Sequence, residues 1–154
     1  MPYYHVRGEI DGVTSAYKTS ALGICTVSPT RRGKVFEINL GTLANPNSTD
    51  TYIDWDLSRI STSGTTTAWT PTAQDPADGA AQFISGINAT VEPTVTANST
   101  LKRWGMNQRN TLRWVAPQES QMLIWAATSL SGICLRGLSS TYTATASGTL
   151  DIME

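Results

Sequence analysis

The chain of 154 residues contains one histidine and two cysteines, so few arrangements of catalytic side chains are open to it. His5 is the one candidate general base for a serine nucleophile, and it lies in the first few residues, where chains are commonly mobile. A general base must be held within hydrogen-bond reach of the proton that it accepts. The position of His5 therefore disfavours a Ser-His-Asp site and favours surface or inter-subunit packing.

Carboxylates are more numerous, but no two of them form an isolated pair of the kind that glycoside hydrolysis uses. On outward strand faces, carboxylates ordinarily face solvent and discourage edge-to-edge aggregation. Asp50, Asp54 and Asp56 could share one side of a strand, which leaves a calcium site open as a minor alternative. The spacing and the loop glycine of an EF-hand are absent. We therefore predict no metal ion and no cofactor.

Cys25 and Cys134 both lie inside short apolar runs that resemble strands. We expect two buried thiols, with a disulfide between them as the less favoured alternative. Two cysteines and one histidine fall short of the four ligands of a structural zinc site. The sequence also lacks glycine-rich nucleotide loops and Cys-x-x-Cys redox motifs. Together these observations predict that the protein is not an enzyme.

The charge balance and the hydropathy argue against two classes of partner. The formal net charge is −1, so the electrostatic basis for non-specific binding to nucleic acid is missing. No apolar run approaches the roughly 20 residues that a membrane span needs. The first residues also lack the basic and apolar regions of a secretory signal. We expect a protein that is made in the cytosol and binds neither nucleic acid nor membrane.

Alternation of apolar and polar residues with a period of two recurs along the chain, which is typical of half-buried strands. In the segment 50–57, the odd-numbered positions from Ile53 to Leu57 are expected to face the core. In the segment 34–40, the even-numbered positions from Phe36 onward are expected to do so. Further segments with a strand pattern are 12–18, 22–28, 100–106, 111–116, 121–127, 132–137 and 141–152.

The chain length and the short, regularly spaced strands predict an all-β fold, a single antiparallel β-sandwich over residues 1–154. We expect residues 1–9 to form an N-terminal arm and residues 61–90 to form a long excursion between two sheet strands. Within the excursion, Asp75 is a favourable N-cap and is followed by proline, which suits the first position of a helix. We therefore predict one short helix over residues 76–85.

The one local run of positive charge consists of Arg31, Arg32 and Lys34, and we expect it at the tip of a hairpin. A run of this kind is commonly a solvated tip. Its functional alternative is a small contact patch for an acidic partner surface.

The aromatic residues allow two interpretations. Trp55 and Trp114 occupy alternating positions that suit a core, whereas Trp69 and Trp125 are predicted to be exposed or at an interface, where tryptophan is enriched. With Tyr52, the tryptophans could also stack on sugar rings. A carbohydrate-binding module or a receptor-binding, fibre-like domain is therefore the alternative function.

Three stretches of the second half, 92–98, 105–116 and 132–136, resemble a pattern in small structural proteins of tailed bacteriophages. Those proteins are the head decoration, or cement, proteins. The most specific part is Asn-Gln-Arg-x-Thr-x-Arg-Trp at 107–114, and the resemblance covers most of the chain in its order of strands and turns. Trp125 and the two cysteines depart from the family's pattern.

The resemblance implies a jelly-roll sandwich that trimerises and sits on the outside of a capsid lattice. The implied partners are the protein itself, as a homotrimer, and the major capsid protein. The implied location is the capsid surface of the virion, after synthesis in the cytoplasm of the bacterial host. Under this hypothesis the capsid contacts are His5, Arg31, Arg32 and Lys34, and the oligomer interface holds Trp69 and Trp125.

Overall fold

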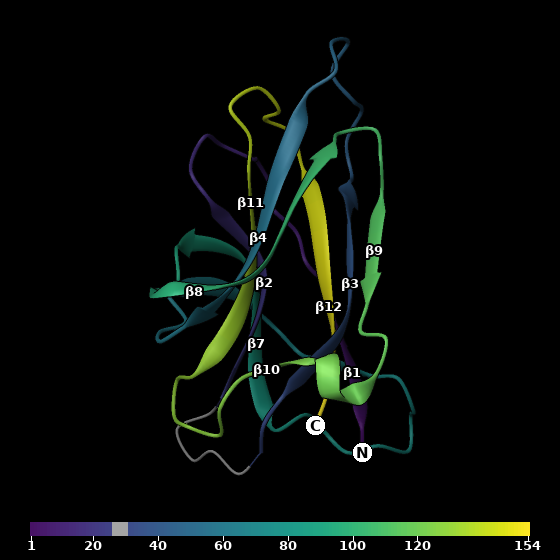
Figure 1. Ribbon diagram of the computed structural model, residues 1–154, viewed down its shortest axis with the longest axis vertical. Coiled ribbons are helices and arrows are strands. Elements are labelled where there is room, and N and C mark those ends of the chain that lie inside the picture. Colours follow the sequence, from purple (N-terminus) through teal and green to yellow (C-terminus); the bar gives the residue numbers. More distant parts are fainter. Residues whose placement is uncertain (26–30) are drawn as a thin grey trace.

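The computed structural model describes residues 1–25 and 31–154, which form two antiparallel β-sheets packed against each other (Figure 1). Sheet A contains β1 (Tyr3–Val6), β3 (Lys34–Thr42), β6 (Thr72–Ala73), β9 (Leu112–Val115), β10 (Leu123–Ile124) and β12 (Ala146–Met153). Sheet B contains β2 (Lys18–Cys25), β4 (Tyr52–Ile60), β5 (Thr65–Trp69), β7 (Phe83–Val91), β8 (Val95–Asn107) and β11 (Gly132–Leu138). The prediction of an all-β fold built from antiparallel sheets is confirmed.

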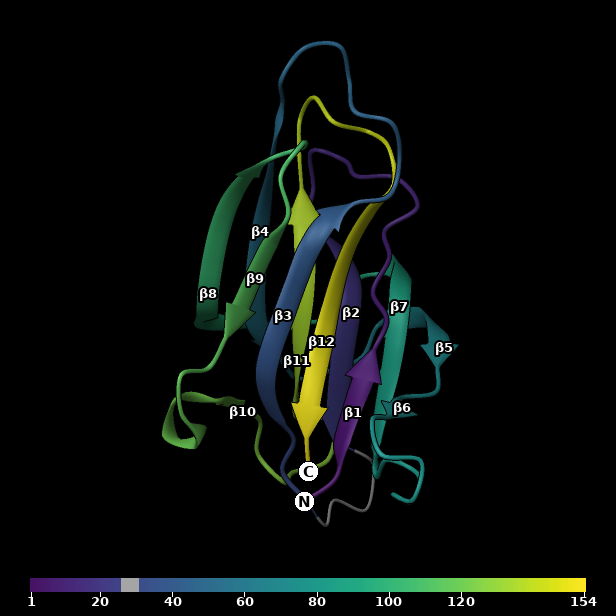
Figure 2. The same cartoon turned by 90° about the vertical axis from the view of Figure 1, so that its right-hand side faces the viewer.

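The strand order shows that neighbours in a sheet are often distant in the sequence. Sheet A runs β10-β3-β12-β1-β6, and β9 also pairs with β3, further along that strand than β10. Sheet B runs β5-β7-β2-β11-β4-β8. Figure 2 shows β3, β12 and β1 side by side in sheet A, with the strands of sheet B behind them. Each sheet therefore interleaves strands from the two halves of the chain.

The core lies between the inner faces of the two sheets. On β4, Ile53, Trp55 and Leu57 are each 0% exposed, which confirms the alternation predicted for the segment 50–57. Trp114 on β9, also predicted for the core, is half-buried and packs against its rim. The difference arises because β9 is a short strand at the edge of sheet A, where the facing sheet covers less of it.

The indole of Trp55 fills the space between the sheets where two glycines face it. A Cβ atom at Gly148 of β12 would lie 2.7 Å from the Trp55 ring and 2.8 Å from Leu135. A Cβ atom at Gly137 of β11 would lie 3.2 Å from the same ring. The largest side chain of the core thus fits because the strands around it have no side chain at these points.

Trp125 occupies a second such place, which corrects the prediction that it lies at an interface between subunits. It is 1% exposed and makes an edge-to-face contact with Phe83, with ring centroids 5.6 Å apart. A Cβ atom at Gly33 would lie 1.9 Å from the Trp125 ring, and one at Gly23 would lie 2.8 Å from it. The position of Trp125 could not be derived from the segment 121–127, because the glycines that accommodate it come from the first part of the chain.

The first residues of β3 contain a β-bulge that changes which side chains face the core. Two successive residues of β12 pair with Val35 and Glu37, so Phe36 is the extra residue between them. Val35 is buried, whereas Phe36 contacts the ring of Tyr3 edge-on, with centroids 5.3 Å apart. The alternation predicted from Phe36 onward is therefore correct only after the bulge.

The predicted N-terminal arm is wrong over most of its length. Within residues 1–9, β1 pairs with β12 on one side and with β6 on the other, so it is an inner strand of sheet A. The excursion predicted for 61–90 likewise contributes β5, β6 and most of β7 to the sheets. Both segments find their partners in distant parts of the chain, which local patterns do not reveal.

The helix predicted over 76–85 is not formed. The carboxylate of Asp75 accepts a hydrogen bond from the Ala77 N–H at 2.8 Å, and the Asp78 N–H bonds the Asp75 carbonyl, which closes one turn. From Phe83 to Ala89 alternate residues are buried, and the segment pairs with β2 as β7. Tertiary pairing of this apolar alternation prevails over the local capping signal.

Other predicted strands differ mainly in their limits. In the segment 12–18, only the last residue, Lys18, belongs to a strand, because β2 begins there. Residues 26–28 of the segment 22–28 lie outside the described residues. In 121–127 the strand is reduced to β10, preceded by the 3-10 helix η1 (Glu119–Gln121). The segments 100–106, 111–116, 132–137 and 141–152 correspond to β8, β9, β11 and β12. In the part of the chain described, no helix is long and apolar enough to cross a membrane.

The packing of Trp125 on Gly33 gives a first testable prediction. Replacing Gly33 by Ala should lower the free energy of unfolding by about 3 kcal/mol or more, because the new methyl group overlaps the indole ring. Urea denaturation measures the change. The matched control is Gly105→Ala, where a Cβ atom meets nothing within 4 Å and the expected change is within about 0.5 kcal/mol. Equal stability of the two variants would contradict the packing described.

Candidate functional site

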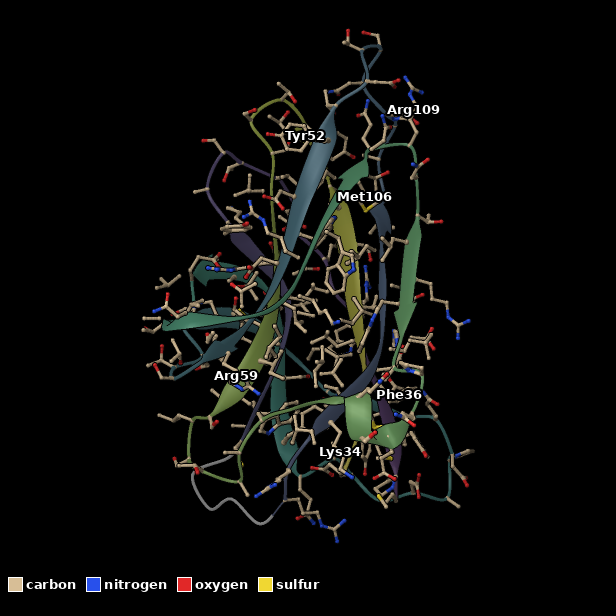
Figure 3. The ribbon with its side chains drawn as sticks, viewed as in Figure 1. Lys34, Phe36, Tyr52, Arg59, Met106 and Arg109 are labelled. Atoms are coloured by element: carbon tan, nitrogen blue, oxygen red, sulfur yellow. The ribbon has the colours of Figure 1, made fainter. Side chains whose placement is uncertain are left out.

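The positively charged residues predicted to contact a partner lie at the end of the sandwich that also holds both chain termini (Figures 1 and 3). Lys34 begins β3 at this end, and Arg31 and Arg32 precede it, separated from it by Gly33. Arg31 and Arg32 are both exposed. The structure adds Arg59, which is exposed near the end of β4. We call these four residues the basic end.

Two arginines of the basic end line one shallow hollow of about 290 Å³. Arg32 and Arg59 share it with Ile124, Trp125 and Ala126. A guanidinium nitrogen of Arg59 donates to the carbonyl of Ile124 at 3.4 Å. No pattern in the sequence places Arg59 here, because the hollow joins the end of β4 to segments far from it in the chain.

Lys34 differs from the arginines because its charge is partly satisfied within the subunit. Its ammonium group pairs with the carboxylate of Glu119 at 2.5 Å, and its side chain is 22% exposed. The pair links the start of β3 to η1, beside the short strand β10. Of the predicted contact residues, Arg31 and Arg32 are therefore better placed than Lys34 to meet a partner.

His5 lies on the outer face of sheet A and is bound to a carboxylate. Its Nδ1 lies 2.8 Å from Oδ1 of Asp151 on β12, and the amide of Gln74 donates to the same oxygen at 3.2 Å. This hydrogen bond with Asp151 raises the pKa of His5, although partial burial opposes the rise. The structure thus assigns His5 a contact that joins β1 to β12 and does not bring it into the hollow of Arg32 and Arg59.

Next to this pair, Glu37 is held by a two-pronged contact. Nε and Nη2 of Arg113 donate to its two carboxylate oxygens at 2.6 and 2.7 Å. The hydrogen bonds from Arg113 lower the pKa of Glu37. Because Asp151 pairs with Glu37 across β12 and β3, the outer face of sheet A carries a row of charges over four strands, in which two neighbouring carboxylates lie between His5 and Arg113.

The raised pKa of His5 predicts a pH-dependent stability. A histidine with a raised folded-state pKa stabilises the fold fully below its unfolded pKa of about 6.5, and the contribution is lost as pH rises through the folded pKa. Replacing His5 by Gln should therefore reduce stability more at a pH of about 5.5 than at a pH of about 9. Thermal unfolding of both proteins across this range measures the difference. A difference that is constant with pH would contradict the pairing with Asp151.

Trp69, the second predicted interface residue, is half-buried at the edge of sheet B. It packs against the core cluster, and the guanidinium carbon of Arg7 lies 5.7 Å from its ring centroid. Along the opposite edges of the sheets, Trp104 of β8 lies 6.5 Å from Trp114 of β9, centroid to centroid. This tryptophan pair, which the sequence did not predict, joins the two sheets where β8 and β9 run side by side (Figure 2).

The opposite end of the sandwich is built around Gln108, a residue of the Asn-Gln-Arg stretch that carries the family resemblance. Gln108 is 1% exposed, and its side chain binds the backbone of the loop between β3 and β4. Its amide donates to the carbonyl of Thr49 at 2.9 Å and to that of Asn47 at 3.3 Å, while its carbonyl accepts from the Asn47 N–H at 2.9 Å. Both N–H donors of this amide and one of the two lone pairs of its carbonyl oxygen thus bind the loop.

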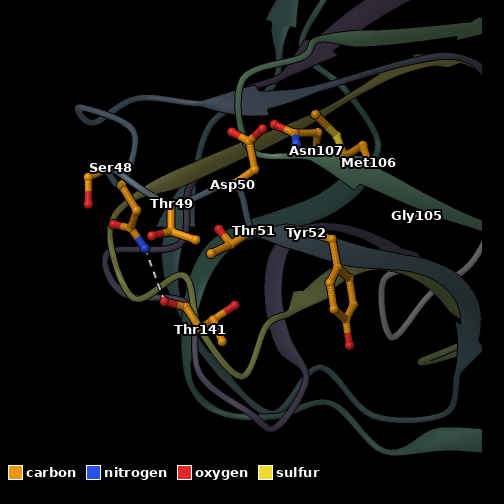
Figure 4. Close-up of a pocket in the computed structure, with 10 residues that line it drawn as sticks. Ser48, Thr49, Asp50, Thr51, Tyr52, Gly105, Met106, Asn107 and Thr141 are labelled. Carbon is orange, nitrogen blue, oxygen red and sulfur yellow. Dashed lines mark hydrogen bonds between the residues drawn. The ribbon is translucent and has the colours of Figure 1, made fainter.

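Neighbouring residues hold the same loop from outside. Arg109 donates from Nε to the carboxylate of Asp50 at 2.7 Å and from Nη2 to the carbonyl of Asn47 at 2.7 Å. The amide of Asn47 in turn donates to the carbonyl of Thr141 at 3.1 Å (Figure 4). The loop is therefore fixed to β8 and to the connection between β11 and β12.

Beside this loop lies an open hollow of about 850 Å³. The residues that line it include Asp50, Tyr52, Gly105, Asn107 and Thr141 (Figure 4). The ring of Tyr52 is exposed, at 55% for the whole residue. Tyr52 and Asp50 were noted in the sequence for other reasons, but their convergence with Asn107 and Gly105 depends on the pairing of β4 with β8.

A third stability prediction follows from Gln108. Replacing it by Ala leaves the Asn47 N–H and the Thr49 carbonyl without their partner, and an unsatisfied buried group costs about 1–3 kcal/mol. We expect a loss of about 2 kcal/mol in urea denaturation and faster hydrogen exchange at the Asn47 amide. Gln118→Ala, at an exposed position, is the matched control and should change neither quantity. Slow exchange at Asn47 in the Gln108 variant would show that the loop does not depend on this side chain.

Within the described ranges, no group of three or more His, Cys, Asp or Glu side chains gathers where it could hold a metal ion. Asp54 instead accepts hydrogen bonds from Arg103, and Asp56 accepts one from Arg136 at 2.8 Å. Cys25 and Cys134 are both buried thiols, and burial raises the pKa of Cys134 to about 12. A cysteine with a raised pKa has little of the thiolate form that nucleophilic chemistry requires.

Comparison of the chain with protein-family models, with curated proteins and with solved structures found no match.

Proposed function

We propose that this chain is a structural virion protein that binds the outside of a bacteriophage capsid and stabilises it, acting as a homotrimer of jelly-roll subunits. The supporting observation is the strand order. With β5, β6, β7 and β10 set aside, one sheet runs β1-β12-β3-β9 and the other runs β2-β11-β4-β8. Such an order corresponds to two interlocked Greek keys, the arrangement of the jelly rolls that viral capsid proteins use.

The additional strands of this chain extend that arrangement without interrupting it. The segment between β4 and β8 adds β7 and β5 beyond β2, and it adds β6 beyond β1. These insertions widen both sheets on one side of the sandwich. A wider, rigid subunit of this kind suits a protein whose task is to cover surface and hold neighbouring subunits together.

The basic end is the surface that we assign to the capsid. Arg31, Arg32 and Arg59 present exposed guanidinium groups there, and two of them flank a hollow with an apolar floor. Guanidinium groups bind carboxylates with paired hydrogen bonds, so an acidic segment of the major capsid protein is the matching partner. His5, which is bound to Asp151, supports this end by fixing β1 in sheet A.

The trimer contacts that we propose lie along the sheet edges. Half-buried indoles occur at both sides of the sandwich, Trp69 on β5 and the pair of Trp104 and Trp114 on β8 and β9. A neighbouring subunit would bury the remaining surface of these rings, and large aromatic side chains contribute strongly to such interfaces. Trp125 has no part in this interface because it is already buried within the subunit.

Charge reversal at the basic end tests the proposal. Arg31→Glu combined with Arg32→Glu should slow and weaken binding to capsids stripped of this protein, chiefly at low ionic strength, because each rim charge contributes about 1 kcal/mol or less. Adding Arg59→Glu should weaken binding further. Co-sedimentation with stripped capsids and the occupancy of capsid sites in electron micrographs measure the effect. Folding and the mass of the trimer in light scattering should not change.

The matched control is Lys18→Glu, which reverses a charge at the start of β2, away from the basic end, and should leave capsid binding unchanged. Equal weakening by the control would show that net charge, and not the basic end, governs the association. Failure of the unmodified protein to bind stripped capsids at any ionic strength would overturn the proposed function.

A further inference from the structure

We propose that the hollow beside the loop between β3 and β4 is a binding site for a neutral saccharide. This inference goes beyond the proposed capsid role, since it concerns the end of the subunit opposite to the basic end. Figure 3 shows Tyr52 and Arg109 at one end of the sandwich and Lys34 toward the other. A subunit docked through the basic end would therefore present this hollow away from the capsid.

The aromatic surface of the site is Tyr52, whose side chain projects from β4 into the hollow (Figure 4). Tyr52 pairs directly with Asn107 across β4 and β8, so the two side chains stand on the same face of sheet B. The next residue of β8 on that face is Gly105, where a Cβ atom would meet nothing within 4 Å. The absence of a side chain there leaves one flank of the Tyr52 ring open to a ligand.

The polar groups of the hollow are of the types that bind sugar hydroxyls. Asp50 offers a carboxylate whose side chain is 68% exposed, and it accepts from Arg109 through one oxygen. Asn107 and Thr141 add an amide and a hydroxyl to the lining. A pyranose has an apolar face of C–H groups and a rim of hydroxyls, so an aromatic ring beside planar polar side chains complements both parts.

The charges around the hollow favour a neutral ligand. Asp50 is paired with Arg109, and Asp54, which follows Tyr52 on the same face of β4, is paired with Arg103 at 3.0 Å. Each acidic group is thus matched by a guanidinium group. A charged sugar, such as a uronic acid, would meet no net charge of opposite sign, whereas a neutral sugar could use both members of each pair as hydrogen-bonding groups.

The loop that forms one wall is held in place before any ligand arrives. Gln108 binds the loop backbone at Asn47 and Thr49, and Arg109 binds it at Asn47 and Asp50. A preformed site loses less conformational entropy on binding than a mobile one. This rigidity distinguishes the hollow from an ordinary surface depression, and it gives the buried Gln108 a role in holding the shape of the site.

The experiment uses the isolated protein and neutral trisaccharides built from glucose, mannose or galactose. Saturation-transfer NMR identifies those that bind, and titration calorimetry gives their affinities. We expect at least one of the three to bind, and a trisaccharide of uronic acids to bind more weakly. No binding by any neutral trisaccharide, or stronger binding of the acidic one, would overturn the proposal. Because no capsid is present, the result is independent of the proposed virion role.

Variants then locate the site. Tyr52→Ala should weaken binding by about tenfold or more, which corresponds to the loss of one aromatic contact, whereas Tyr52→Phe should retain it. Gly105→Gln, which fills the open flank of the ring, should also weaken it. The matched control is Tyr3→Ala, at an exposed tyrosine of sheet A, which should bind as the unmodified protein does. Binding that survives both Tyr52→Ala and Gly105→Gln would overturn the assignment, and melting temperatures confirm that each variant is folded.

Discussion

The packing of two indole rings between the sheets is the constraint on which the rest of the structure depends. Trp55 fits because Gly137 and Gly148 face it, and Trp125 fits because Gly33 lies against its ring. Protein interiors are packed as densely as organic crystals, so rings of this size require strands without side chains at the facing points. The glycines thereby fix how β11 and β12 lie against β4, and how β3 begins. These contacts therefore determine the geometry of both ends of the sandwich.

The outer faces of the sheets are held by a different interaction, the pairing of charges across neighbouring strands. Asp56 on β4 is 3% exposed, and Nε of Arg136 on β11 donates to it at 2.8 Å. On sheet A, Asp151 holds His5 in the same manner. Removing one partner of a buried pair leaves an uncompensated charge, which is strongly destabilising. Charged residues that a sequence pattern assigns to solvent therefore stabilise the fold here. The exposed arginines of the basic end are in contrast better candidates for contacts with a partner.

The sequence predicted the buried side chains correctly where one strand carries a regular alternation. It predicted secondary structure poorly where pairing with a distant strand determines it. The segment 50–57 has such an alternation, and its inward residues are all buried. In contrast, the helix signal around Asp75 competes with the pairing of the following residues in β7, and the pairing prevails. The first nine residues give no local signal of their place inside sheet A, because that place depends on β12 at the other end of the chain.

The sequence by itself determined that the protein is an all-β domain with almost no net charge and one run of basic residues. These properties follow from residue types and a period of two, both of which are local. Only the tertiary structure decided that Trp125 is buried, that Arg59 joins Arg32, and that Tyr52 meets Gly105 in one hollow. The physical reason is common to all three. Each contact joins segments that are brought together by the order of strands in the sheets, and that order is fixed by packing across the core and not by any single stretch of the chain.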